Sequence, residues 1–209
     1  MILELDNLYH IYNQGNNRQK IFFKLENYHY FLKKISEHIL PFADIIAYCL
    51  MPNHFHLMVY VKQVEIERPM RSQGFTQSEA LTTQRFNDSI GVMLRSYTRA
   101  INKQEKMSGS LFRSLTKAEC LTKTCGCSPS FYNTSTGTQI SIQIPERQYP
   151  QVCFEYIHNN PVKAKLVKRP EDWDFSSYKD YYRDRDGKLI NRERAKEFVV
   201  VKASLKVKP

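Results

Sequence analysis

The first third of the chain divides into short apolar segments separated by turn residues. Residues 5–13 predict a strand, and the Gln-Gly-Asn-Asn sequence that follows predicts a turn. Within residues 26–40 apolar side chains recur at helical spacing, and a proline follows the segment. Residues 42–51 and 54–61 are two apolar runs separated by a Pro-Asn pair, so we expect two strands joined by a tight turn.

The rest of the chain is more polar. Residues 78–104 carry an apolar stripe at helical spacing and predict a long helix, whereas residues 109–121 predict a strand or a strand pair. Residues 123–145 are rich in Ser, Thr, Gly and Asn, which indicates an inserted loop with room for a small hairpin. Residues 147–160 predict a helix that stops at the next residue, a proline, and residues 176–182 predict a short helix.

The predicted order is therefore β-α-β-β-α-β-α. Antiparallel strands combined with packed helices favour an α+β fold, a ferredoxin-like sandwich with a central antiparallel sheet and helices on one face. We expect one domain over residues 1–182, with residues 123–145 as an insert, and a basic C-terminal tail over residues 183–209 that frays at its Lys-rich end.

The sequence predicts no membrane-spanning helix. Of 209 residues, 42% are hydrophobic and 25% are charged, as in ordinary globular proteins. No apolar run approaches the roughly 18–20 residues that span a bilayer, and the N-terminus has acidic residues early and lacks the basic start of a secretory signal. We therefore expect a cytoplasmic protein.

Charge points to a polyanionic partner. The chain has 31 Lys and Arg against 21 Asp and Glu, which gives a net charge of +10. Such a surplus favours nucleic acid, and 13 Tyr and 12 Phe supply side chains on which unpaired bases can stack.

The five cysteines do not form a metal-binding pattern. Cys49 lies in an apolar run and is expected in the core. Cys120, Cys125 and Cys127 lack the second matching pair that a structural zinc site requires. We expect free thiols.

The predicted strand 54–61 begins with His54-Phe55-His56. Residues i and i+2 of a strand point to the same face, about 7 Å apart. Two imidazoles at this spacing can converge on one divalent ion while Phe55 packs on the opposite face. Two histidines on a half-exposed strand remain the simpler interpretation of this motif alone, and a catalytic ion needs further ligands.

The predicted helix 147–160 supplies candidates for these ligands. Tyr156 and Asn160 are four residues apart and share one helix face. Asn160 can bring an amide oxygen to a metal ion while Tyr156 presents its phenol beside it. A free phenol has a pKa near 10 and is a poor nucleophile at neutral pH. A bound cation would polarise a phosphodiester and help to stabilise the phenolate.

Together these motifs resemble the single-tyrosine HUH transposases, and most closely the branch of REP-associated tyrosine transposases. The resemblance covers roughly residues 5–182 without the insert. Its motifs are Tyr9–Arg18, Tyr48–Leu57, Ser96-Tyr97 with Asn102, Gly109–Arg113, Tyr156–Ala164, and Asp172-Trp173 with Ser176–Tyr178. The Ser/Thr-rich insert departs from that branch by its length.

The resemblance implies a mechanism. It is metal-dependent cleavage and rejoining of single-stranded or hairpin DNA through a 5′-phosphotyrosine intermediate. By motif match, His54, His56 and Asn160 would hold Mg²⁺ or Mn²⁺ and Tyr156 would be the nucleophile. Family members can donate the tyrosine helix in trans, so a homodimer is an expected partner arrangement.

Two residues compete for these roles. Tyr97 is a second candidate nucleophile on a basic helix, but it falls within the apolar stripe and is expected in the core. His158 competes with Asn160 as a ligand; we expect it to point away and to lie at the surface or toward DNA.

Several basic residues are candidates for phosphate contacts, which give affinity and register without reading sequence. They are Arg18, Arg113, Lys163 and Lys165, with Lys168 and Arg169 nearby. Two competing functions stay open: a related HUH nickase of replication or conjugation, and a non-catalytic nucleic-acid-binding protein on the same scaffold.

Overall fold

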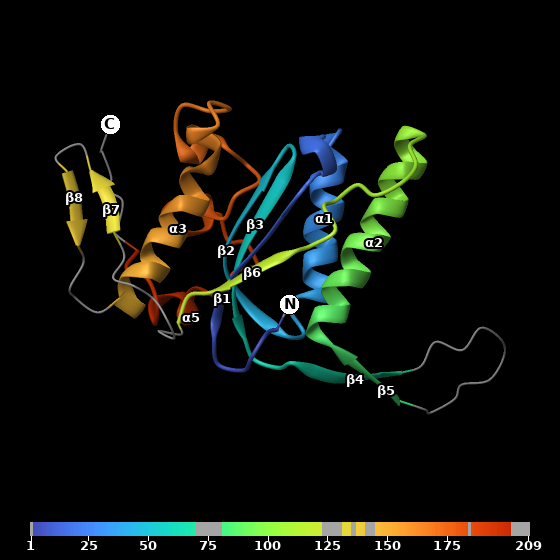
Figure 1. Ribbon diagram of the computed structural model, residues 1–209, viewed down its shortest axis with the longest axis horizontal. Helices are drawn as coiled ribbons and strands as arrows, with labels where there is room; N and C mark the ends of the chain where they lie inside the picture. The colour runs from blue at the N-terminus through green and yellow to red at the C-terminus, as the bar shows by residue number, and fades with distance from the viewer. Residues whose placement is uncertain are drawn as a thin grey trace.

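A four-stranded antiparallel sheet forms the centre of the molecule. The structure is a computed structural model that describes residues 2–69, 81–122, 131–134, 137–140, 145–183 and 185–201. The sheet contains β1 (Leu8–Gln14), β2 (Ala43–Met51), β3 (His54–Val61) and β6 (Lys117–Cys120) in the order β2-β3-β1-β6. Each neighbouring pair is antiparallel, so β1 and β3 are the two inner strands (Figure 1).

Helices cover both faces of this sheet. The larger core contains Phe55 and Leu57 of β3 together with apolar side chains of α1 (Leu25–His38) and α2 (Phe86–Glu105). The second core joins Met58 of β3 to Phe154 of α3 (Pro145–Lys163). Figure 1 shows α1 and α2 on one side of the sheet and α3 on the other.

This arrangement corrects one prediction. The mixed α+β class and the central antiparallel sheet are confirmed, but the helices do not all lie on one face. The reason is that the sheet is apolar on both faces: every residue of β2 is buried, and a register shift between Ile45 and Ala47 turns Ile46 and Ala47 together toward α3. A sheet with two apolar faces requires a layer on each.

The remaining elements are short. They are the 3-10 helices η1 (Asn16–Arg18) and η2 (Pro170–Asp172), the hairpin of β4 (Glu65–Pro69) and β5 (Leu81–Arg85), the hairpin of β7 (Phe131–Thr134) and β8 (Gly137–Ile140), and the helices α4 (Tyr178–Tyr182) and α5 (Arg192–Lys196). Among the described helices none is long and apolar enough to cross a membrane.

Two predicted helix boundaries were wrong. The helix expected from residue 78 begins at Phe86, because the Thr-containing segment Leu81–Arg85 pairs with β4 instead; residues 78–80 lie outside the described residues. The helix expected to stop before Pro161 continues to Lys163, since the Ala164 N–H donates to the Asn160 carbonyl and closes the last turn around the proline.

The C-terminal segment packs against the sheet. In residues 185–201, Ala195 and Val199 are buried in the core beneath α3, and the Asn191 N–H donates to the Ile45 carbonyl of β2. Arg194 also forms an ion pair with Asp44. Residues 185–201 are therefore part of the layer on the α3 side; the expected frayed end beyond residue 201 lies outside the described residues.

Candidate active site

The first half of the site lies on β3. In the antiparallel pair of β1 and β3, Tyr12 lies opposite His56 and Gln14 lies opposite His54. Strand alternation directs both histidines to the α3 side, while Phe55 is fully buried on the other side against Phe31 and Phe112.

The second half lies on α3. Asn160 Oδ1 lies 3.3 Å from His54 Nε2, and Asn160 Nδ2 lies 3.2 Å from His56 Nε2. The Tyr156 ring, one helical turn earlier, lies edge-on to His56 with 5.4 Å between ring centroids. Residues that are about a hundred positions apart in sequence thus meet within one chain.

The proton of His54 can be assigned from its partners. His54 Nδ1 lies 2.6 Å from Asn53 Oδ1, an oxygen that only accepts, while Asn53 Nδ2 donates to the Arg18 carbonyl. The single proton of a neutral His54 ring therefore sits on Nδ1. Its Nε2 then carries a lone pair that faces Asn160 Oδ1, which is also an acceptor.

His56 is assigned in the same way. The amide of Asn160 donates to His56 Nε2, so the proton of a neutral His56 ring sits on Nδ1. That proton is donated to His10 Nε2, 2.9 Å away. His10 thereby fixes the tautomer of His56, as partners of metal-bound histidines commonly do.

Burial keeps these rings neutral. It lowers the pKa of His56 to about 2, with the neighbouring His10 and His54 rings adding to the effect. Burial also lowers the pKa of His10 to about 4 against an opposing effect of Glu119. The pKa of His54 is lowered by burial and partly restored by Asn160. Neutral imidazoles are the form that binds metal ions.

The donor set fits a divalent cation. Two imidazole nitrogens and an amide oxygen converge, and the facing lone pairs of His54 and Asn160 have no proton between them. Oxygen suits Mg²⁺ and Mn²⁺, and imidazole suits the transition metals. The candidate ligands are therefore two histidines and the amide of Asn160. Among the described residues no group of three or more His, Cys, Asp and Glu side chains is arranged to hold a metal ion.

A cavity of about 250 Å³ opens beside these donors. It is bounded by His54, His56 and Tyr156 and, at its basic side, by Arg113 and Lys117. Tyr156 is 38% exposed, so its phenol is accessible to a substrate.

The comparisons with known proteins agree with this arrangement at the level of the fold. A solved structure of a REP-associated tyrosine transposase bound to a REP hairpin superposes on the chain with a TM-score of 0.50. The match covers 91% of this chain and 92% of that chain. The chain has the fold of a REP-associated tyrosine transposase. Sequence identity is 15%. Neither a family model nor a curated protein matches the sequence.

The predicted basic residues separate into two groups. Arg113 borders the cavity, and Lys163 lies over the Tyr156 ring with its Nζ 5.1 Å from the ring centroid. Arg18, in η1, and Lys165, in the turn after α3, are exposed and line neither this cavity nor the neighbouring one over Tyr156.

The two competing residues are both buried. Tyr97 is fully buried and its hydroxyl donates to the Ile21 carbonyl, which confirms a core role. The expectation that His158 lies at the surface was wrong: it is 2% exposed, and its Nε2 lies 2.7 Å from Ser177 Oγ. Ser177, Tyr178 and Tyr181 cover this face of α3, which the sequence pattern did not indicate.

Sequence reasoning missed three residues of the site. His10 contacts His56, Tyr12 stacks on His10 with 4.7 Å between ring centroids, and Lys117 lies over the Tyr12 ring. The alternation of His10 and Tyr12 on the first predicted strand was a usable signal. It became informative only with the knowledge that β1 pairs with β3.

Proposed function

We propose that the chain is a metal-dependent transposase that cleaves and rejoins single-stranded DNA through a 5′-phosphotyrosine intermediate. The observation that supports the proposal best is the convergence of His54 Nε2, His56 Nε2 and Asn160 Oδ1 beside the accessible Tyr156 ring. Metal-bound phosphodiester and tyrosine nucleophile would then share one cavity.

The chemistry follows from the residues. The Tyr156 phenol loses its proton to solvent, and its oxygen attacks phosphorus. The bond from phosphorus to the 3′-oxygen breaks, and the leaving 3′-oxygen takes up a proton from solvent to give a free 3′-hydroxyl. A bound Mg²⁺ or Mn²⁺ would withdraw electron density from the phosphate and favour the phenolate. Lys163, beside the Tyr156 ring, adds a positive charge near the developing negative charge.

Rejoining is the reverse reaction. A 3′-hydroxyl attacks the phosphotyrosine, the new phosphodiester forms, and the phenol oxygen leaves. The energy of the broken bond is held in the phosphotyrosine, so no further energy source is required.

The ferredoxin-like assignment belongs to the same proposal. Taking β1, α1, β2, β3, α2 and β6 as the core elements, the strand order β2-β3-β1-β6 with both helices on one face supports a split βαβ arrangement. In this scheme α3 is an addition on the opposite face that carries the nucleophile.

We propose single-stranded or hairpin DNA as the substrate. The similar solved protein is bound to a REP hairpin, and the net charge of +10 favours a polyanion. Because α3 places Tyr156 beside the histidines of its own chain, a homodimer that exchanges this helix is not required for cleavage.

The test is formation of a covalent adduct. Wild-type protein incubated with Mn²⁺ and a hairpin oligonucleotide carrying a single-stranded flank should yield a protein–DNA species that survives denaturing electrophoresis. Tyr156→Phe should abolish it, whereas Tyr12→Phe and the matched control Tyr30→Phe should retain it. The Tyr12 ring also lies near His56, with 5.8 Å between ring centroids, but its hydroxyl donates to Glu119. An adduct with Tyr156→Phe would refute the mechanism. Hairpin binding without any adduct from wild type would favour the non-catalytic alternative.

A further inference from the structure

A second cavity, of about 410 Å³, lies between α2 and the segment 109–116. Three arginines line it: Arg95 and Arg99 from α2, and Arg113 from the segment. All three are exposed. No aspartate or glutamate is among the residues that line it.

The helix presents its two arginines on one face. Arg95 and Arg99 are four residues apart, so they stand one above the other. The guanidinium of Arg95 lies over Gly91, where an added Cβ would stand 3.0 Å from Arg95 Nη1. A glycine here leaves the side chain room to lie along the helix.

The charge of this cavity is uncompensated. Within the described residues, Arg95, Arg99 and Arg113 form no ion pair. Three like charges around one cavity raise its positive potential and favour an anionic occupant.

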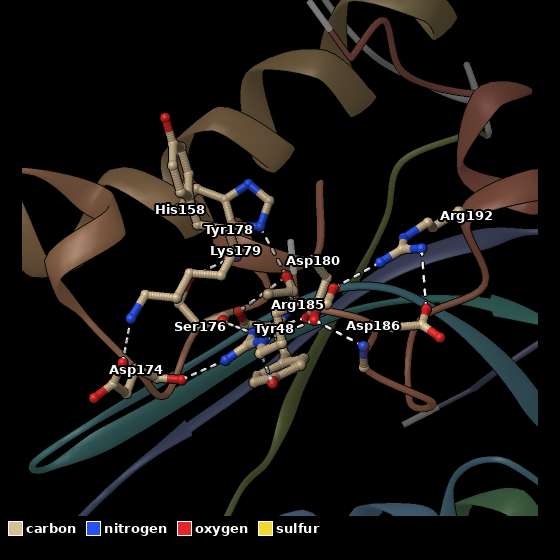
Figure 2. A network of polar contacts seen from close by, with 12 residues as sticks. Tyr48, His158, Asp174, Ser176, Tyr178, Lys179, Asp180, Arg185, Asp186 and Arg192 are labelled. Carbon is tan, nitrogen blue, oxygen red and sulfur yellow. Dashed lines mark hydrogen bonds and ion pairs between the residues drawn. The ribbon is translucent and has the colours of Figure 1, made fainter. Parts of the chain in front are cut away.

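Another cavity, lined by Arg183, Arg185 and Arg192, shows the opposite arrangement. Figure 2 shows the polar contacts of Arg185 and Arg192. There Arg185 donates two hydrogen bonds of 2.7 Å to the buried Asp180 and a third to the Asp174 carbonyl. Arg192 and Arg183 form ion pairs with Asp186 and Glu171. These arginines hold the C-terminal segment together and leave little charge for a ligand.

The uncompensated cavity adjoins the cavity of the candidate active site. Arg113 and Asn13 line both this cavity and the one beside His54 and His56. The Arg113 N–H donates to the Gln14 carbonyl, and the Asn13 side chain donates to the Arg113 carbonyl and to Thr116 Oγ1. These bonds fix the segment at the end of β1, between the two cavities.

We propose that the groove formed by Arg95, Arg99 and Arg113 binds the phosphodiester backbone of the DNA strand where it leaves the candidate active site. Guanidinium groups pair with phosphate oxygens in a bidentate manner, and the lining hydroxyl of Ser114 is a further donor. The groove would set affinity and register without reading base sequence. That a cleavage site lies at the end of this groove rests on the proposed function, whereas the binding of an anion in the groove does not.

The experiment measures DNA binding in the Tyr156→Phe background, so that no covalent step contributes. The probes are a fluorescent DNA hairpin without a flank and an unstructured single-stranded oligonucleotide, titrated from 0.05 to about 0.3 M salt. Arg95→Gln/Arg99→Gln should weaken binding of one or both probes and make the slope of log K against log salt shallower by about 2, or about 1 per lost phosphate contact. Which probe responds shows whether stem or flank occupies the groove.

Two controls complete the test. Arg95→Lys/Arg99→Lys should retain most of the slope because the charge stays, and Arg183→Gln, in the paired cavity, should leave it unchanged. An unaltered slope for Arg95→Gln/Arg99→Gln with both probes, or an equal loss for Arg183→Gln, would overturn the proposal. The outcome is independent of catalysis: absence of a covalent adduct from wild type would refute the proposed function and leave the groove standing.

Discussion

At the scale of single residues, the side-chain amide of Asn160 contacts two imidazole rings with two different atoms. Its Nδ2 donates to His56, which turns its Oδ1 toward the lone pair of His54. A side chain with two acceptors would lose the donated bond, and one with two donors would lose the oxygen. A cation bound by both imidazoles would replace the hydrogen bond that Asn160 donates, because the single lone pair of His56 Nε2 cannot accept a proton and bind a metal ion at once.

His10 is expected to affect the metal affinity of this site through His56. His10→Ala removes the acceptor of the His56 Nδ1 proton, so His56 can rotate or change tautomer. We expect the affinity for Mn²⁺, measured by calorimetry, to fall by about 10–100-fold, as for other partners of metal-bound histidines.

The matched control for His10 is Tyr12→Phe. It removes the hydroxyl that donates to Glu119 but keeps the ring that stacks on His10, so Mn²⁺ affinity should persist. Equal Mn²⁺ affinity in His10→Ala and wild type would show that His10 does not act through His56.

At the scale of elements, the position of α3 decides whether the site exists. Phe154 and Ile157 are fully buried and anchor the helix in the core. His158, on the same buried side, reaches Ser177 Oγ, which in turn accepts from the Tyr48 N–H of β2. The exposed Tyr156 is thereby directed to the opposite side, toward the histidines.

Ser177→Ala should weaken this attachment. The substitution leaves His158 Nε2 and the Tyr48 N–H without a partner, and each buried unsatisfied group costs about 1–3 kcal/mol. We expect the free energy of unfolding, from urea denaturation, to fall by about 2–6 kcal/mol. Ser36→Ala, on the exposed face of α1, should change it by less than about 0.5 kcal/mol. Similar losses in both variants would contradict the attachment.

The sequence was most informative where periodicity was strong. Strand β3 has the predicted bounds, and the i, i+4 relation of Tyr156 and Asn160 holds on α3. The layer on which α3 lies could not be predicted, because that depends on which apolar face of a two-sided sheet remains uncovered. For the same reason His158 was misplaced, and the role of His10 required the pairing of β1 with β3.

At the scale of the whole molecule, with its net charge of +10, basic side chains have different roles on different parts of the surface. On the C-terminal side arginines are paired with carboxylates and serve the fold, as Arg185 does with Asp180. On the α2 side Arg95 and Arg99 are without ion pairs among the described residues. They line a cavity that shares Asn13 and Arg113 with the cavity of the candidate active site. Charge that stabilises the fold and charge available to a polyanion are thus on different parts of the surface.

The buried histidines make the stability of the whole molecule depend on pH. Burial lowers the pKa of His10 to about 4, of His56 to about 2 and of His158 to about 3, whereas unfolding returns each toward its ordinary value near 6.5. Below pH 6.5 the unfolded chain therefore binds more protons than the folded one, so the stability present at pH 7.5 is lost as the pH falls toward 4.

Three such groups give a loss of up to about 4 kcal/mol per pH unit around pH 5, where carboxylates titrate little. Urea denaturation at pH 7.5, 6 and 5 measures this slope. His158→Gln should reduce this slope by about a third, while Ser36→Ala, which removes no titratable group, should leave it unchanged. A stability that is flat from pH 7.5 to 5 would show that these rings are not held neutral by the fold.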